Sequence, residues 1–400
     1  MRNENVNSLK MKAHNFQLIL NTLRHKESLT RKELSRLTGL TLGAITILVN
    51  ELIERGYVVE QRQGSSTGGR KPVFLSLRSE AAYAIGLELS TNEIICVLGD
   101  FNARIITEKT VRIDAMWDRK SIIQTMADTI EGVIASSGME KTAIRGIGLA
   151  IPGPADYDEG IMLDPPNFPG WVNVHIRDII REKTGLEVFI AKETSCAALS
   201  EYWFGKSRDY ERIFAIHIGE RGIGGAMIDN GEVFTSPHGE TMNIGHTIIQ
   251  AGGYMCVCGR RGCLEAQANS WAAMRYALDY ANRHPEIRSC AKREMSINDL
   301  IRGVDENDAA CVEGIKRCAA YIEAAISNIE LLLNPERIYY RGGFAERCPL
   351  LIEEIKRCHE QEAMYETTKP ITIEPLTFGR ESASIGALAL VFSHISASSE

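Results

Sequence analysis

The amino-terminal segment, residues 1–80, places hydrophobic side chains at helical spacing in three successive stretches. Phe16, Ile19, Leu20 and Leu23 fall at positions i, i+3, i+4 and i+7, which predicts one buried face of an amphipathic helix. Two shorter helices follow, and their expected inward positions are Leu34 and Leu37 in the second and Ile45, Leu48, Val49, Leu52 and Ile53 in the third.

The residues between these stretches predict where the helices begin and turn. Thr30 and Glu33 have the spacing of a capping box, in which each side chain accepts from a free backbone amide of the first turn. Gly39 suits the tight turn before the third helix, and Thr41 suits its N-cap. The order of helices and caps predicts a helix-turn-helix.

The third helix is therefore expected to enter the major groove of DNA with its amino-terminal, outward residues. These residues are Thr41, Leu42, Gly43, Thr46 and Asn50. The set contains no Arg or Gln for a bidentate base contact, so we expect specificity to come from Asn50, apolar contacts to thymine methyl groups and DNA shape.

Two extended segments, 57–60 and 73–77, flank a polar Gly-rich loop and predict a two-stranded wing. Arg70 and Lys71 lie in that loop and suit the minor groove or the phosphates. A winged helix that binds protein instead of DNA is the alternative for this head.

From residue 82 the pattern changes to strands mixed with helices. Strands are expected at 83–90, 92–100, 103–113 and 144–154, with a helix at 121–136 before the last of them. The second half repeats the order, with strands at 214–219, 224–234 and 337–343 and a helix at 308–333. We therefore expect an α/β fold in which a winged helix-turn-helix precedes a duplicated, actin-like or ribonuclease-H-like body of two lobes.

The formal net charge of −7 is divided unevenly along the chain. Residues 1–80 carry 13 Lys and Arg against 7 Glu and no Asp, a balance of +6 that leaves −13 for the remainder. A basic head on an acidic body is expected when only the head approaches a polyanion. The absence of an apolar run of about 20 residues or of a signal core predicts a cytoplasmic protein without a membrane span.

Four of the possible metal ligands are clustered in the sequence. His246, Cys256, Cys258 and Cys263 offer one imidazole and three thiolates, the ligand set of a closed structural zinc site. Gly259 and Gly262 let the loop turn tightly between the cysteines. Other cysteines, such as Cys196, Cys311 and Cys318, lie on helical patterns and are expected to be small core residues.

Several motifs together carry a family resemblance. They are GLAIPGPADYDEG and PPNFPGW, the run GERGIGGAMIDNG, and IGH followed by CVCGRRGCLE. With the helix-turn-helix in front, the chain resembles the repressor branch of the ROK family of repressors and sugar kinases over essentially its whole length. The resemblance implies that zinc braces the loop that shapes a sugar pocket, and that His246 is similar to the residue that binds zinc and faces the sugar.

Where the resemblance implies kinase chemistry, this chain departs from the pattern. The family's glycine-containing Asp-Ile-Gly-Gly-Thr turn is replaced by residues 88–92, Glu-Leu-Ser-Thr-Asn, and Glu220 places a carboxylate in the second Gly-rich segment. Side chains there obstruct the approach of phosphate to backbone amides. Lys192 and Glu193 stand where the family has its catalytic Asn-Asp pair, and we expect Glu193 to be inactive as a base because of its extra methylene.

The same comparison predicts which residues contact an effector. They are Asn167, Lys192, Glu193, Asn243, His246 and Glu265. One interpretation is a pocket for a different ligand, in which Lys192 adds a cation suited to a sugar phosphate or sugar acid. The other is a pocket that no longer binds a sugar, in which Lys192 pairs with Glu193 or another neighbouring acid.

These observations predict a winged helix-turn-helix at 1–80 and a first lobe at 81–196, completed by a helix at 381–396. They place a second lobe, with the zinc loop and an oligomerisation surface, at 197–380. We expect a homodimer or homotetramer that binds double-stranded operator DNA, responds to a sugar or sugar derivative and represses carbohydrate genes. An active ROK sugar kinase with a regulatory head and a protein adaptor are the alternatives.

Overall fold

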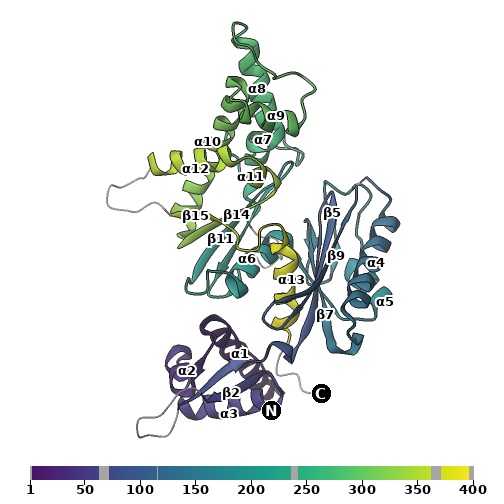
Figure 1. The fold of residues 1–400 in the computed structure, drawn as a ribbon, viewed down its shortest axis with the longest axis vertical. Helices are drawn as coiled ribbons and strands as arrows, with labels where there is room; N and C mark the ends of the chain where they lie inside the picture. The colour runs from purple at the N-terminus through teal and green to yellow at the C-terminus, as the bar shows by residue number, and fades with distance from the viewer. Residues whose placement is uncertain (1, 63–71, 115, 236–241, 362–370, 396–400) are drawn as a thin grey trace. The chain divides into compact units, whose positions relative to one another are not determined.

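The computed structural model forms two compact units (Figure 1). It describes residues 2–62, 72–114, 116–235, 242–361 and 371–395. The first unit takes in 1–209 and 381–400, and the second takes in 210–380. The division therefore falls after residue 209 and not after 196, because helix α6 (Glu193–Phe204) packs tightly on α13 (Ser382–Ser393). A Cβ on Gly386 of α13 would lie 1.6 Å from the carbonyl oxygen of Cys196 in α6.

The head begins the first unit. Its helices and strands are α1 (Arg2–Lys26), β1 (Leu29–Thr30), α2 (Arg31–Thr38), α3 (Leu42–Glu54), β2 (Val58–Arg62) and β3 (Val73–Leu77). The strands form an antiparallel sheet in the order β1-β3-β2, and the two-residue β1 was not predicted from the sequence. Arg70 and Lys71 of the wing loop lie outside the described residues.

The predicted caps of the helix-turn-helix are confirmed. The side chain of Thr30 accepts from the Glu33 amide in a complete capping box, and the side chain of Thr41 accepts from the Ala44 amide. Gly39 takes a φ of 71° between the helices, a conformation that favours glycine. Helices α2 and α3 are bent by 114° to each other. That angle falls within the roughly 90–120° typical of helix-turn-helix motifs.

The predicted inward faces of the head are confirmed except at Leu37 and at Ile53, which is only half-buried. Phe16, Ile19, Leu20 and Leu23 are all buried, but Leu37 is 45% exposed and its prediction was wrong. Helix α2 is short and ends at Thr38, so Leu34 is its one buried side chain. Within the described part of the chain, no single helix is long and apolar enough to cross a membrane, and only α2 and α3 together meet that test as a bent pair.

The remainder of the first unit is a five-stranded mixed sheet with helices on both faces. Its strands are β4 (Tyr83–Leu89), β5 (Glu93–Asp100), β6 (Ile105–Arg112), β7 (Ile144–Ile151) and β10 (Val188–Lys192), in the order β10-β7-β4-β5-β6. Side chains of α4 (Arg119–Ser137) and α5 (Ile176–Thr184) share a core with alternate residues of β4, β5, β7 and β10. Gly86 and Gly148 bring α13 close to the opposite face, since a Cβ at these positions would lie 1.8 Å and 1.9 Å, respectively, from a carbonyl oxygen of α13.

The second unit repeats this arrangement. Its strands are β11 (Arg212–Ile218), β12 (Ile223–Asp229), β13 (Glu232–Val233), β14 (Arg337–Arg341) and β15 (Thr372–Pro375), in the order β13-β12-β11-β14-β15. In each unit three antiparallel strands are continued by two parallel strands beside the first of them. The duplicated actin-like fold expected from the sequence is confirmed.

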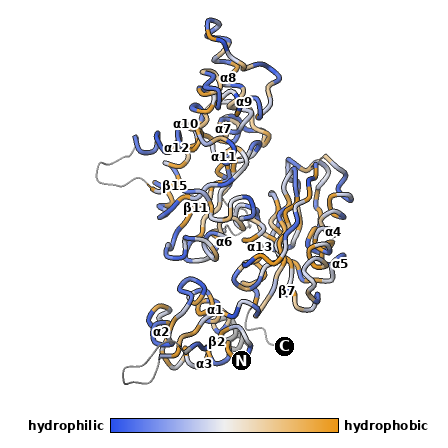
Figure 2. The backbone as a smooth tube through the Cα atoms, viewed as in Figure 1, coloured by the Kyte–Doolittle hydropathy of each residue, from blue (hydrophilic) through white to orange (hydrophobic). Residues whose placement is uncertain are grey.

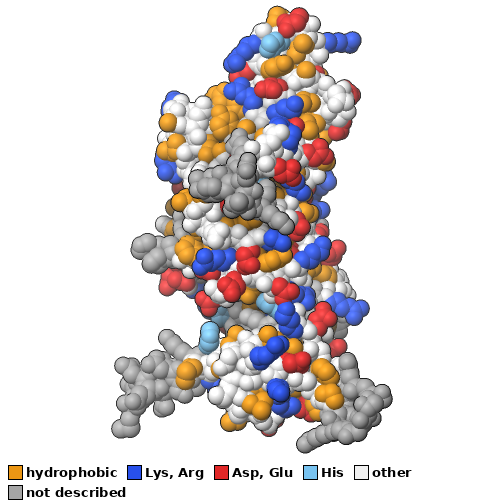
Figure 3. Space-filling model, turned by 90° about the vertical axis from the view of Figure 1, so that its left-hand side faces the viewer, with side chains coloured by type: hydrophobic (Ala, Val, Ile, Leu, Met, Phe, Trp, Pro, Cys, Tyr) orange, Lys and Arg blue, Asp and Glu red, His pale blue; other side chains and the backbone are white. Residues whose placement is uncertain are grey.

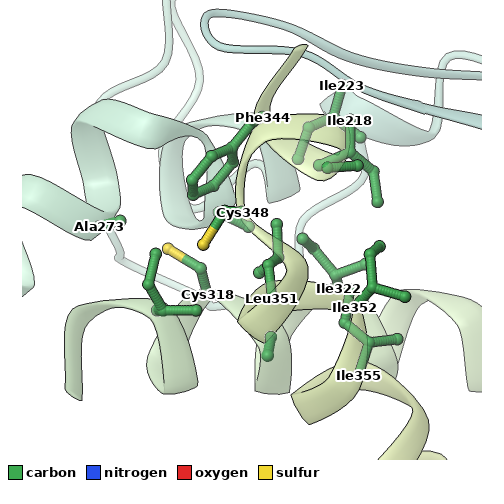
Figure 4. Packing of buried hydrophobic residues seen from close by; sticks show 14 of the residues in the cluster. Ile218, Ile223, Ala273, Cys318, Ile322, Phe344, Cys348, Leu351, Ile352 and Ile355 are labelled. Carbon is green, nitrogen blue, oxygen red and sulfur yellow. The ribbon is translucent and has the colours of Figure 1, made fainter. Parts of the chain in front are cut away.

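The core of the second unit lies between its sheet and its helices. These helices are α7 (Leu264–Ala268), α8 (Ser270–Arg283), α9 (Ile297–Asp305), α10 (Ala309–Leu333), α11 (Gly343–Arg347) and α12 (Pro349–Gln361). Cys318 and Ile322 of α10 pack against Leu351 and Ile355 of α12 (Figure 4). Cys196, Cys311 and Cys318 are fully buried, as the sequence predicted.

Hydrophobic stretches of the backbone run along the strands of the first unit's sheet and along α13 (Figure 2). Acidic and basic side chains are mixed on the face drawn in Figure 3. Among the residues that the structure describes, neither sign of charge forms a continuous patch on that face (Figure 3).

A buried histidine makes the stability of the second unit depend on pH. His359 of α12 lies with Nδ1 3.4 Å from Glu323 Oε1 and Nε2 3.6 Å from Glu330 Oε2. The hydrogen bond with Glu323 raises the pKa of His359, and Glu330 and Glu360 act in the same direction against burial. Because the folded pKa lies above the unfolded one, this stabilisation is complete below about pH 6.5 and is lost as the pH rises through the folded value.

We therefore expect His359→Gln to lower the unfolding temperature of the second unit more at pH 6 than at pH 8.5. Calorimetry at both pH values measures the difference, and His284→Gln, which removes an exposed histidine beside Glu286, is the matched control. An equal loss at both pH values would show that the ion pair does not stabilise the unit.

Candidate functional site

The amino-terminal half of α3 presents a mostly exposed face. Thr41, Leu42, Gly43 and Asn50 are exposed and Thr46 is half-buried, whereas the opposite stripe, Ile45, Leu48, Val49 and Leu52, is buried. Two of the hydroxyls are already used within the helix. Thr41 caps it, and Thr46 donates to the carbonyl of Leu42 at 2.7 Å.

Two residues that sequence reasoning missed belong to this face. Ile47 is 69% exposed and lies one turn after Gly43. The sequence could have indicated this exposure, because Ile47 does not belong to the stripe of inward positions of the third helix. Arg31, at the start of α2, donates to Asn50 Oδ1 at 2.8 Å and to Glu60 of β2 at 2.7 Å. Arg31 thus orients Asn50 and ties the recognition helix to the wing.

The head is attached to the first lobe by a buried cation, Arg24 of α1. Its guanidinium lies 4.5 Å from the ring centre of Trp203, 4.9 Å from that of Phe101 and 5.7 Å from that of Phe204. Arg24 is only 5% exposed, and burial, with a smaller effect of Arg208, lowers its pKa to about 9. Among the described residues its Nε and Nη2 have no hydrogen-bond partner, so the aromatic rings are its principal compensation.

Neighbouring residues extend this junction. The His25 ring meets Tyr202 edge to face at 5.0 Å, and Arg208 donates to the carbonyls of both Arg24 and Phe204. In a second contact between α1 and the first lobe, the Gln17 side chain donates to the Ser393 carbonyl of α13 at 2.8 Å. Helix α1 therefore rests on α6 and α13 of the first lobe.

Helix α6 connects this junction to two predicted effector residues. Lys192 ends strand β10 and forms the N-cap of α6, and Glu193 is the first residue of the helix. Trp203 and Phe204 are the last two residues of the same helix. A displacement at its amino end would therefore reach the Arg24 contacts through one rigid element.

Four candidate ligands gather in the second unit. His246, Cys256, Cys258 and Cys263 each offer a ligand atom, and all these atoms lie within 4.8 Å of one another. Gly262 is essential to the loop, because its φ is 82° and a Cβ there would lie 1.7 Å from the Gln250 carbonyl oxygen. The sequence prediction that these four residues converge is confirmed.

The spacing of the ligand atoms suits a tetrahedral ion. Zn–S and Zn–N bonds of about 2.3 Å and 2.0 Å give tetrahedral edges of roughly 3.8 Å between two sulfurs and roughly 3.5 Å between sulfur and nitrogen. Cys258 Sγ lies 3.6 Å from Cys263 Sγ, and Cys256 Sγ lies 3.6 Å from His246 Nδ1. Burial raises the pKa of Cys256 to about 12; for Cys258 burial acts upward too, but hydrogen bonds from Arg260 help to bring the pKa to about 7.

The predicted effector residues divide between the two units. Lys192 and Glu193 are half-buried and Asn167 is exposed, all in the first unit. In the second unit, Asn243 precedes the short helix that carries His246, and Glu265 Oε2 accepts from the Ile223 amide at 3.2 Å. Each unit thus provides three of the six residues.

Comparison with known proteins identifies the body. The model of the ROK family matches residues 84–394, more than three quarters of the chain. The chain belongs to the ROK family. Residues 10–71 match the model of the MarR family, and these residues contain the helix-turn-helix described above.

Relatives of this ROK chain include regulators and kinases. It is 27% identical over 386 residues to a xylose repressor from Caldicellulosiruptor bescii, covering 96% of each chain. It is 29% identical over 275 residues to a glucokinase from Halalkalibacterium halodurans, covering 68% of this chain and 83% of the relative. A solved ROK family transcriptional regulator, a homologue of the E. coli MLC protein, is 25% identical, with a TM-score of 0.78 and 96% of each chain covered.

The turn at which the family resemblance implied a phosphate-binding pair of glycines is a hairpin filled by side chains. Between β4 and β5, the Ser90 hydroxyl donates to Asn92 Oδ1 and to the Glu93 carbonyl, each at 3.0 Å, and the Ser90 amide donates to the same carbonyl. The hydroxyl and amide of Ser90 are therefore used within the turn.

The second Gly-rich turn of the ROK body is held by an ion pair. The Gly219 amide donates to the Gly222 carbonyl, and Glu220 Oε1 accepts from Arg347 of α11 at 2.5 Å. Ser270 of α8 donates to the Glu220 carbonyl at 2.8 Å. A carboxylate with its own cation thus occupies the position where the sequence comparison expected phosphate.

Removal of the buried cation tests the junction. We expect Arg24→Ala to loosen α1 from α6, because a desolvated cation–π contact contributes about 2 kcal/mol. Arg24→Lys is expected to rescue little, since an ammonium lacks the planar stacking surface of a guanidinium. Amide hydrogen exchange of residues 16–26 measures the effect, and Arg36→Ala, at an exposed arginine of α2, is the control. Unchanged exchange in Arg24→Ala would contradict the assigned role.

Proposed function

We propose that the protein is a DNA-binding transcriptional repressor of carbohydrate genes that responds to a sugar or sugar derivative. The observation that carries the proposal is the exposed face of α3, in a helix pair bent by 114°, joined to a ROK body. The named function of the xylose repressor, which matches both head and body, supports the same conclusion.

On DNA, α3 enters the major groove with Thr41, Leu42, Gly43, Thr46 and Asn50. Leu42 and Ile47 are exposed apolar side chains on this face. Such side chains suit contacts to thymine methyl groups. Asn50 reads a base edge while Arg31 holds its oxygen. Arg70 and Lys71 of the wing contact the minor groove or the phosphates.

The effector binds to Asn167, Lys192, Glu193, Asn243, His246 and Glu265. The position of Lys192 and Glu193 at the start of α6 supports this assignment, because the far end of α6 holds Arg24 of the head. Ligand binding that favours one position of α6 shifts the head between two states with different DNA affinity. Lys192 suits an anionic sugar derivative.

We assign a structural zinc ion to His246, Cys256, Cys258 and Cys263. Three thiolates and one imidazole complete four-coordination, so the ion stabilises the loop and leaves no open position for a substrate. Cys263 is the N-cap of α7, which carries Glu265, so the ion also positions an effector residue.

A ROK kinase with a regulatory head is the alternative. The filled Ser90 hairpin and the Glu220–Arg347 ion pair favour a regulator without phosphoryl transfer, with Glu193 inactive at the base position. ATP-dependent phosphorylation of a hexose by the purified protein would support the kinase instead.

The protein acts as a homodimer or homotetramer on inverted-repeat operators. Leu331 and Leu332, at the carboxyl end of α10, are both exposed. They offer apolar surface for contacts between second units. The two heads of a dimer then bind the two half-sites of the operator, which lie one helical turn apart.

The metal assignment is tested by elemental analysis. The wild-type protein is expected to contain about one zinc per chain, and Cys263→Ser is expected to lose most of it and to unfold at a lower temperature. Cys358→Ser, on α12 outside the cluster, is the matched control and should keep its zinc. A zinc-free wild-type protein, purified from zinc-containing medium without chelators, would contradict the assignment.

The DNA-binding face is tested by selecting bound fragments from genomic DNA. Asn50→Ala is expected to weaken binding to the selected fragments by about 1–3 kcal/mol while leaving the salt dependence of non-specific binding unchanged. Arg31→Ala should weaken the same selectivity, because it releases Asn50. Arg181→Ala, an exposed variant of α5 in the body, is the control. The absence of any selected fragment with the wild-type protein would overturn the proposal.

A further inference from the structure

A second pair of thiols lies in the second unit outside the zinc cluster. Cys290 belongs to the segment between α8 and α9, and Cys311 is the third residue of α10. Their sulfur atoms are 3.6 Å apart, which is van der Waals contact. Cys290 is exposed, whereas Cys311 is fully buried.

The backbones of the two cysteines are held close by one carboxylate. Asp308, the N-cap of α10, accepts from the Cys290 amide at Oδ2 (2.7 Å) and from the Cys311 amide at Oδ1 (3.1 Å). The backbones of Cys290 and Cys311 are therefore held near each other by hydrogen bonds to the same carboxylate. A disulfide needs such proximity, with Cα atoms about 4.4–6.8 Å apart.

A glycine on the neighbouring helix makes room for the sulfur atoms. A Cβ on Gly303 of α9 would lie 2.5 Å from Cys311 Sγ and 2.8 Å from Cys290 Sγ. The sulfur pair is thus enclosed by three elements, with Cys290 as its solvent-facing member.

We propose that Cys290 and Cys311 form a reversible disulfide when the protein meets hydrogen peroxide. The Cys290 thiolate attacks one peroxide oxygen and breaks the O–O bond, which gives a sulfenic acid and, after protonation of the leaving oxygen, water. The Cys311 sulfur then attacks the Cys290 sulfur, the S–O bond breaks, and a second water leaves with the Cys311 proton. Two thiols are oxidised, and one peroxide is reduced to two waters.

Burial raises the pKa of both thiols, and Asp308 adds to the shift, so Cys290 reacts through the minor fraction that is ionised at neutral pH. Cytoplasmic disulfides are typically transient and form in response to oxidation. The cross-link would close the segment 290–311 and attach the segment between α8 and α9 covalently to the first turn of α10.

A metal ion is the rival occupant, because Cys290, Asp308 and Cys311 place their ligand atoms within 4.8 Å. Asp308 already accepts four hydrogen bonds, from the Ser289 hydroxyl and from the amides of Cys290, Ala310 and Cys311. The Asp308 carboxylate therefore serves as the N-cap of α10. This use of its oxygens favours a pair of thiols over a metal site at this position.

The test is mass spectrometry of the full-length, metal-loaded protein after treatment with hydrogen peroxide. Digestion without reductant is expected to give a cross-linked pair of peptides holding Cys290 and Cys311, lighter than the separate peptides by two hydrogens. A thiol reductant should reverse it. The cross-linked protein should also unfold at a higher temperature than the reduced protein. Cys290→Ser should lose both effects, and the control Cys358→Ser should keep both.

Three outcomes would overturn the proposal. One is oxidation of Cys290 to sulfinic acid without a cross-link, and another is cross-linking confined to Cys256, Cys258 and Cys263. The third is a second equivalent of metal in the wild-type protein that Cys290→Ser alone removes, which would assign the pair to a metal ion.

Discussion

Burial of the Arg24 guanidinium among Phe101, Trp203 and Phe204 joins the head to the first lobe, and the proposed regulation depends on it. A buried cation without complete hydrogen bonding is costly, so the three rings must stay in place for the head to stay docked. Trp203 and Phe204 are the last two residues of helix α6, and Glu193 is its first residue. One helix therefore contacts the head at one end and contributes to the proposed effector site at the other.

The two turns at which the family resemblance implied phosphate binding carry side chains, while the close packing of the actin-like scaffold is kept. Glycines at 86, 148 and 386 still allow α13 to approach the sheet and α6 closely. By contrast, Ser90 fills one turn, and the Glu220–Arg347 pair locks the other. Side chains thus occupy both turns at which the family resemblance implied phosphate binding.

Local signals in the sequence predicted much of this structure. The Thr30–Glu33 capping box, the N-cap at Thr41 and the convergence of His246 with three cysteines depend on residues close in the chain, and all are confirmed. The repeated order of strands and helices predicted the duplicated body. The six proposed effector residues remain a prediction, since three of them lie in the first unit and three in the second.

What the sequence did not reveal depends on contacts between distant segments. Arg24 lies in a charged stretch that is typical of an exposed helix end, and its burial depends on rings that lie far along the chain. The bond from Arg31 to Asn50, and the contact of Cys290 with Cys311, join residues with no common motif. The boundary after residue 209 likewise follows from the packing of α6 on α13, which residues near 196 alone do not indicate.

The most direct test of the central claim is fluorescence anisotropy of a selected DNA fragment, titrated with wild-type protein and with Arg24→Ala at fixed salt. Pools of sugars, sugar phosphates and sugar acids are added to each titration. We expect one pool to change the DNA affinity of the wild-type protein, and Arg24→Ala to bind DNA with a much smaller response to that pool. A wild-type affinity that no pool changes, or an equal response in Arg24→Ala, would contradict coupling through α6.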